Sequence, residues 1–127
     1  MIVNDRLSDL FSIEAILSDL NANIVRATSG PEALRYLLNM EVAVIILDIN
    51  MPEMDGFETA RLIRQREQTS HTPIIFVTAY AKSELDIKRG YELGAVDYLF
   101  IPIDPNVLRS KIVALIDLFN TARIVQQ

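Results

Sequence analysis

Val42-Ala43-Val44-Ile45-Ile46-Leu47-Asp48 is the stretch that decides the fold, because six apolar residues run without a break into one carboxylate. An apolar run without polar alternation is typical of a strand covered on both faces, as in a parallel sheet. Met51-Pro52 and Asp55-Gly56 follow, and they predict a turn in which Gly56 tolerates a positive φ. Asp48 is therefore expected at the carboxyl end of a central strand, where open α/β sheets bind ligands.

Apolar runs and amphipathic patterns alternate on both sides of that strand. Four more strands are expected, at 1–3, 24–27, 74–78 and 96–100. Five helices are expected, at 7–20, 31–38, 57–66, 83–93 and 105 to about 121, with a polar loop at 68–72. This alternation predicts βαβ units, and right-handed crossovers favour a flavodoxin-like, doubly wound (βα)5 fold with a five-stranded parallel sheet in the order 2-1-3-4-5.

Local signals mark several of the expected helix ends. Ser29-Gly30-Pro31-Glu32 has the spacing of a capping box, and Ser83 is expected to cap the fourth helix. Gly94 is well placed as that helix's C-terminal stop, and Asp104-Pro105 supplies an N-cap and a first-turn proline for the fifth helix.

Length and composition limit the class of protein. With 127 residues and 14.4 kDa, the chain is expected to form a single domain, 1–127. Its net charge of −5 and pI near 4.8 argue against a direct nucleic-acid surface. The chain has no cysteine, no signal peptide and no apolar stretch of the roughly 20 residues that a membrane helix needs, so a soluble, cytoplasmic location is expected. Because the first expected strand is short, two alternatives stay open. The sequence begins a few residues inside the natural domain, or it is a piece of a longer protein.

Several polar residues are expected to meet at one edge of the sheet. Strands 1, 3 and 4 are neighbours in the predicted order, and they end at Asn4-Asp5, Asp48 and Thr78, with Ile101-Pro102 beside them. Two adjacent carboxylates repel one another unless a cation intervenes, and oxygen ligands without Cys or His favour Mg²⁺. Asp48 could then act as the nucleophile that forms an acyl phosphate, while Thr78 donates a hydrogen bond to a phosphoryl oxygen.

The motifs at these strand ends match a known family. They are Val3-Asn4-Asp5, Leu47-Asp48-Ile49-Asn50-Met51-Pro52-Glu53-Met54-Asp55-Gly56, Val77-Thr78-Ala79 and Gly94-Ala95-Val96-Asp97-Tyr98-Leu99-Phe100-Ile101-Pro102. Over essentially its whole length, the sequence resembles the receiver domain of two-component response regulators or of hybrid histidine kinases.

The resemblance implies a role for each matching residue. Asp48 is the implied phosphoacceptor and an Mg²⁺ ligand, Asp5 the main acidic ligand, and the main-chain carbonyl of Asn50 a further ligand. Thr78 is the hydroxyl that moves toward the phosphoryl group, and Tyr98 is the aromatic that changes rotamer with it. This shift reshapes the face made by helix 4, strand 5 and helix 5. The implied partners are a histidine kinase or histidine phosphotransfer protein and an output domain or partner protein.

Two residues depart from the family pattern. Asn4 replaces the first of two acids, so it is expected to bind the metal weakly or through water. Ile101 replaces a lysine that contacts the phosphoryl group, and a lost charge-assisted contact is worth roughly 1.5–3 kcal/mol, or about ten- to a hundredfold. Lys82 and Lys88 fall on the helix after the fourth strand, and Lys111 is expected to point away from the crevice.

Three classes of function remain open. The favoured one is a non-enzymatic phosphoacceptor domain that retains phosphorylation at Asp48 with a weakened or altered signal. The alternative is a pseudo-receiver that binds proteins without being phosphorylated. A conventional enzyme on a flavodoxin-like fold is disfavoured, because the chain has only four glycines and no glycine-rich phosphate loop. His71, the one histidine, lies in the expected polar loop and is interpreted as a surface residue.

Overall fold

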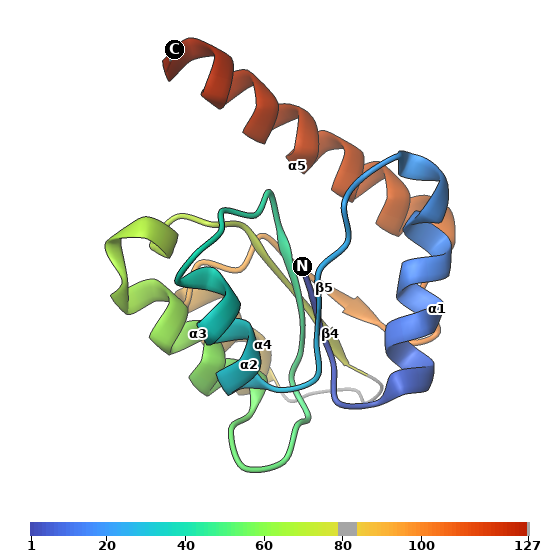
Figure 1. The fold of residues 1–127 in the computed structure, drawn as a ribbon. Coiled ribbons are helices and arrows are strands. Elements are labelled where there is room, and N and C mark those ends of the chain that lie inside the picture. The colour runs from blue at the N-terminus through green and yellow to red at the C-terminus, as the bar shows by residue number, and fades with distance from the viewer. Residues whose placement is uncertain (79–83, 127) are drawn as a thin grey trace.

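The fold is a five-stranded parallel sheet with helices on both faces, seen in a computed structural model that describes residues 1–78 and 84–126 (Figure 1). The strands are β1 (Ile2–Val3), β2 (Arg26–Ala27), β3 (Ile45–Asp48), β4 (Ile74–Thr78) and β5 (Asp97–Phe100). The helices are α1 (Leu7–Leu17), α2 (Gly30–Leu37), α3 (Gly56–Gln65), α4 (Glu84–Glu92) and α5 (Pro105–Gln126), with short 3-10 helices η1 (Ser18–Leu20) and η2 (Glu67–Thr69). The strand order β2-β1-β3-β4-β5 confirms the predicted fold class.

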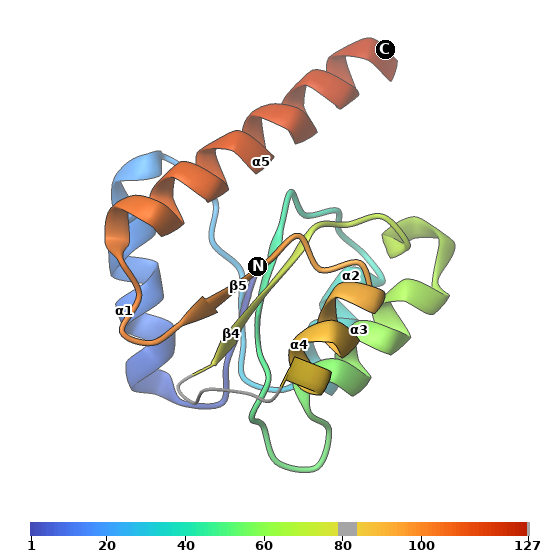
Figure 2. The same cartoon turned by 180° about the vertical axis from the view of Figure 1, so that it is seen from behind.

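The two faces of the sheet carry separate apolar cores. Helices α1 and α5 cover one face, and α2, α3 and α4 cover the other (Figures 1 and 2). Along β3, Ile45 and Leu47 face the second group of helices, whereas Ile46 faces α1 and α5. Apolar residues are thus needed on both faces, which explains why the run before Asp48 has no polar alternation.

The predicted helix signals have the expected geometry. Ser29 Oγ accepts a hydrogen bond from Glu32 N at 3.2 Å, and Asp104 Oδ1 accepts one from Asn106 N at 2.9 Å. Gly94 has a φ of +80°, and the following N–H, of Ala95, donates to Gly90 O at 3.2 Å, which is a Schellman-type helix end. Ser83, the expected cap of α4, lies outside the described residues.

Several element boundaries differ from the predicted ones. Strand β3 begins at Ile45 rather than Val42, because Pro73 precedes its partner β4 and has no N–H for extending the ladder. The polar loop after α3 contains η2, and α5 continues to Gln126 because no Gly or Pro follows Pro105 to end it. Among the described helices, none is both long enough and apolar enough to cross a bilayer.

Gly56 is required for a reason that the sequence did not indicate. The expected positive φ is wrong, since Gly56 opens α3 and Asp55 caps that helix by accepting a hydrogen bond from Glu58 N at 2.8 Å. A Cβ at Gly56 would lie 2.8 Å from the Cα of Ile49 and even closer to the carbonyl oxygen of Asp48. The missing side chain therefore lets α3 begin directly against the end of β3.

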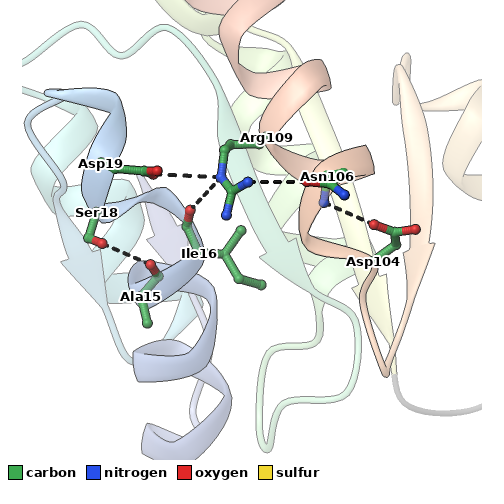
Figure 3. A network of polar contacts seen from close by, with 7 residues as sticks. All are labelled: Ala15, Ile16, Ser18, Asp19, Asp104, Asn106 and Arg109. Carbon is green, nitrogen blue, oxygen red and sulfur yellow. Dashed lines mark hydrogen bonds and ion pairs between the residues drawn. The ribbon is translucent and has the colours of Figure 1, made fainter.

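Arg109 ties α1 and η1 to the first turn of α5 (Figure 3). Its Nε donates to Ile16 O at 3.1 Å and lies 3.6 Å from Asp19 Oδ1. A second nitrogen donates to Asn106 Oδ1 at 3.2 Å, and Asn106 N is itself bound by the Asp104 cap. These contacts hold the two helices of this face at a defined spacing.

Candidate functional site

The predicted polar residues meet at the carboxyl edge of the sheet. The pairing of Val3 with Leu47 places Asp5, just after β1, next to the end of β3. Asp48 is the last residue of β3 and is only 5% exposed. Thr78 is the last residue of the neighbouring β4 and is completely buried. The structure thus brings Asp5, Asp48 and Thr78 to one edge of the sheet, as the topology predicts.

Asp48 is a buried carboxyl group, and few favourable contacts stabilise its ionised form. Burial, together with the nearby carboxylates of Asp5 and Asp9, raises its pKa to about 7. One opposing contact is the backbone N–H of Asn50, which donates to Asp48 Oδ1 at 3.4 Å and lowers the pKa. A cation beside Asp48 would stabilise its charged form by offsetting both burial and repulsion.

Asp5 supplies the observation that tests whether a metal fits here. Its Oδ1 is buried and has no hydrogen-bond partner among the described residues, beside another carboxylate. Burying such an oxygen without a partner is costly, and a hard cation removes that cost. In residues 1–78 and 84–126 no three His, Cys, Asp or Glu side chains gather into a metal cluster. The oxygen-only donors at this edge fit Mg²⁺, which keeps several waters and takes one or two carboxylates.

Asn4 has a local structural contact that sequence reasoning missed. The side chain is 1% exposed, and its Oδ1 accepts a hydrogen bond from Arg6 N at 2.9 Å. This is the Asx-type turn that leads from β1 into α1. An Asn or Asp just after a strand and three residues before a helix begins is the signal that could have indicated it. The role of Asn4 as a weak or water-mediated ligand stays a prediction.

Asn50 connects the two neighbouring strand ends. Its backbone N–H contacts Asp48, and its side-chain Nδ2 donates to Thr78 Oγ1 at 3.2 Å. The side-chain amide of Asn50 therefore holds the hydroxyl oxygen of Thr78 at this edge of the sheet. The next residue along the edge, Ile101, donates its backbone N–H to Thr78 O at 2.9 Å.

Tyr98 lies inward on β5, with its ring 7% exposed. Its hydroxyl donates to Asp86 O at 2.8 Å, and burial raises its pKa to about 12. The ring packs against Phe76, with centroids 5.4 Å apart. Gly90 makes this position possible, because a Cβ there would lie 2.6 Å from Tyr98 Cζ. Sequence reasoning missed Gly90, although a glycine inside a helical pattern indicates a close approach.

Position 101 places no positive charge at the crevice. The side chain of Ile101 packs against the core under α1 and α5 and lines a recess of about 250 Å³ that also includes Asp9. Lys88 is paired with Glu92 at 3.9 Å, and Lys111 is paired with Asp97. Both lysines therefore lie in ion pairs elsewhere, as expected, while Lys82 lies outside the described residues.

Comparison with known families agrees with this geometry. Residues 1–113 match the model of the response regulator receiver domain. The chain belongs to the receiver domain family. This receiver is therefore a regulatory domain of two-component signalling, in which receiver domains work with histidine kinases and with output or partner proteins.

Curated relatives are longer proteins that contain a similar region. A probable cyclic di-GMP phosphodiesterase of Vibrio cholerae is 42% identical over 89 residues, which are 70% of this chain and 20% of that protein. A probable transcriptional regulator, ycf27, of Guillardia theta is 37% identical over 96% of this chain and 46% of its own length. The receiver thus spans less than half of the length of these two relatives.

Solved receiver structures superpose closely on this one. The Vibrio cholerae chemotaxis protein CheY4 is 31% identical, with a TM-score of 0.82 over 90% of this chain and 94% of that chain. The receiver domain of the sensor histidine kinase PA1611 from Pseudomonas aeruginosa is 28% identical, with a TM-score of 0.81 over 91% of this chain and 94% of that one. That structure has a magnesium ion coordinated in its active site cleft.

Proposed function

We propose that this receiver accepts a phosphoryl group on Asp48 in a two-component phosphorelay. The observation that carries the proposal is the pair of adjacent carboxylates after β1 and at the end of β3. Asp48 is buried, and one Asp5 oxygen has no partner in the part of the chain that the structure describes. Such an arrangement is costly for a structural role alone, and it suits a site that is completed by a cation and a phosphoryl group.

The proposed chemistry starts from the ionised carboxylate. An oxygen of Asp48 attacks phosphorus, the bond from phosphorus to the donor atom breaks, and the leaving group takes that bond's electron pair. Asp5, Asp48 and the main-chain carbonyl of Asn50 are the proposed Mg²⁺ ligands, and Asn4 is proposed to contribute weakly or through water. The bound ion would neutralise charge on the transferring group.

The proposed output is a population shift in the face formed by α4, β5 and α5. Asn50 donates to Thr78 Oγ1 in the present state, and a phosphoryl oxygen would draw the hydroxyl toward Asp48 by accepting a hydrogen bond from it. Tyr98, packed against Phe76 two positions before Thr78 on β4, is the proposed link to α4, because its hydroxyl bonds Asp86 O. New charge at Asp48 would then bias one of two packed states and change affinity for a partner.

The same proposal extends to the partners and the location of this receiver. The phosphodonor is proposed to be a histidine kinase or histidine phosphotransfer protein, and the output is proposed to act through an attached domain or partner. Residues 1–127 are proposed to form one cytoplasmic domain that does not itself bind nucleic acid or membrane.

A second function is favoured by one specific observation. The side chain of Ile101 brings neither charge nor hydrogen-bond donor to this edge of the sheet, and it packs against the apolar core instead. A pseudo-receiver that binds partners independently of phosphorylation would tolerate this residue without cost.

Intact mass after incubation with acetyl phosphate separates the two functions. A gain of one phosphoryl group with Mg²⁺, absent in EDTA and absent in Asp48→Asn, is the expected result. No gain in the wild type, together with a gain in Ile101→Lys, would establish the pseudo-receiver.

A further inference from the structure

The carboxylates around Asp48 have no compensating cation in the described part of the chain. Asp5 and Asp9 both act electrostatically on Asp48. Ion pairs between described residues all lie elsewhere and join Arg26 to Glu14, Arg61 to Glu58, Lys88 to Glu92, Arg109 to Asp19 and Lys111 to Asp97. An acyl phosphate on Asp48 would carry about −1.5 to −2 charges in place of the single charge of the carboxylate. The described residues therefore supply no positive charge to offset these carboxylates, before or after the proposed reaction.

A recess opens beside this edge of the sheet. It lies between α1 and the segment that follows β5, and its volume is about 250 Å³. Its walls are mainly apolar and include Ile13, Ile16, Ile101, Pro102 and Ile103. Asp9, the charged residue in the lining, stands in the first turn of α1. The recess thus combines a surface for methylene groups with a carboxylate.

The recess is linked to the carboxyl edge of the sheet through the backbone of Ile101. Ile101 N donates to Thr78 O at 2.9 Å, so the wall that Ile101 forms begins next to the proposed switch residue. Asp9 connects the recess to Asp48 electrostatically. A cation held at the Asp9 end would therefore act on both carboxylates.

The two sides of the recess are held in place by polar contacts. Ile16 contributes to the lining, and its carbonyl oxygen accepts the 3.1 Å hydrogen bond from Arg109 Nε (Figure 3). Arg109 also bonds Asn106 in the first turn of α5, directly after the segment that holds Ile103. An occupant would meet a formed recess and would lose little free energy in ordering it.

A lysine side chain fits this combination of groups. Its four methylenes can lie along apolar walls while its compact ammonium stays near carboxylates and phosphoryl oxygens. We propose that the protein delivering the phosphoryl group inserts a lysine into the recess, where its ammonium supplies the cation that residue 101 does not. This inference rests on the proposed function. The ammonium forms no covalent bond and passes no proton; it offsets charge while the phosphoryl group moves from donor to Asp48.

The experiment uses n-butylammonium chloride as a lysine side-chain probe, because the partner is unidentified. The rate of phosphoryl gain from acetyl phosphate is measured on the full chain at neutral pH with Mg²⁺, by intact mass. n-Butanol is the matched uncharged control, and sodium chloride is the ionic-strength control. We expect n-butylammonium to raise the rate saturably, by up to roughly tenfold, and neither control to do so.

Variants connect the effect to the recess. Ile101→Lys is expected to react faster without the probe and to lose its response to it, because the ammonium is already present. Asp9→Asn is expected to weaken the response several-fold, whereas Asp117→Asn, at an exposed position of α5 outside the recess lining, is expected to keep it. In a titration without phosphodonor or metal, the isoleucine methyl resonances of Ile13, Ile101 and Ile103 are expected to shift.

Each contrary outcome has a separate meaning. A wild type that is phosphorylated normally but responds to n-butylammonium no more than to sodium chloride would overturn the inference. So would a Lys82→Gln variant that slows the probe-free reaction about tenfold, because the cation would then be internal. Failure of both wild type and Ile101→Lys to gain mass would refute the proposed phosphorylation instead, and unshifted methyl resonances would still reject the recess as a binding site.

Discussion

Gly90→Ala is expected to displace Tyr98 from its inward position. The added Cβ would lie 2.6 Å from Tyr98 Cζ and 2.9 Å from Cε2, whereas ordinary van der Waals contact needs 3.4–4 Å. The other side of the ring is occupied, since Phe76 and Tyr91 each lie with their ring centroids 5.4 Å from that of Tyr98. The ring therefore has to leave its place rather than shift within it.

The free energies decide the sign of the effect on stability. Replacing a helical glycine by alanine stabilises by about 1 kcal/mol when nothing clashes. Moving Tyr98 outward loses its hydrogen bond to Asp86 O, worth about 1 kcal/mol, and exposes a ring whose burial contributes about 1.5–3 kcal/mol. The loss exceeds the gain, so Gly90→Ala should lower the free energy of unfolding by about 2 kcal/mol.

Urea unfolding and a tyrosine titration measure this directly. The pKa of Tyr98 should fall from about 12 toward the ordinary 10.0 as its hydroxyl becomes exposed, and Tyr98→Phe identifies its signal among the four tyrosines. In a Tyr98→Ala background, Gly90→Ala should instead stabilise by about 1 kcal/mol. A single Gly90→Ala variant that is more stable than the wild type and keeps a tyrosine pKa near 12 would refute the reasoning.

Three further predictions concern the crevice. In EDTA, Asp48→Asn should be more stable than the wild type by about 2–4 kcal/mol near pH 8 and should lose this advantage near pH 4. The reason is that folding raises the pKa of Asp48 from 3.8 to about 7, so the wild type loses stability as the pH rises through that window. Denaturation at several pH values measures the difference, which would be constant if Asp48 were not the titrating group. Asp5→Ala should weaken Mg²⁺ binding by at least about tenfold in calorimetry, and an unchanged affinity would remove Asp5 from the ligand set. Gly56→Ala should lower the free energy of unfolding by about 1–3 kcal/mol, because the new Cβ would meet backbone atoms of β3 and Ile49. A variant as stable as the wild type in denaturation would instead show that α3 can shift away from β3.

Local sequence signals were sufficient for much of the fold. The run before Asp48, the Ser29 capping box and the Gly94 stop each depend on neighbours within about one helical turn or one strand. Such short-range rules predicted the strand order and the meeting of Asp5 with Asp48, because parallel strands bring their carboxyl ends to one edge. They failed at the start of β3, where the limit comes from Pro73 on a neighbouring strand.

The amino-acid sequence by itself determined the parallel sheet, its order and the residue types at its carboxyl edge, because the periods and caps behind them are local. Tertiary structure alone decided which of those groups lack a partner among residues 1–78 and 84–126. Three features depend on elements that lie far apart in the chain. They are the environment of the Asp5 carboxylate, the packing of Tyr98 against Gly90 and the recess between Asp9 and Ile101. Their contacts depend on packing distances of a few ångströms, which no pattern of residue types along one segment specifies.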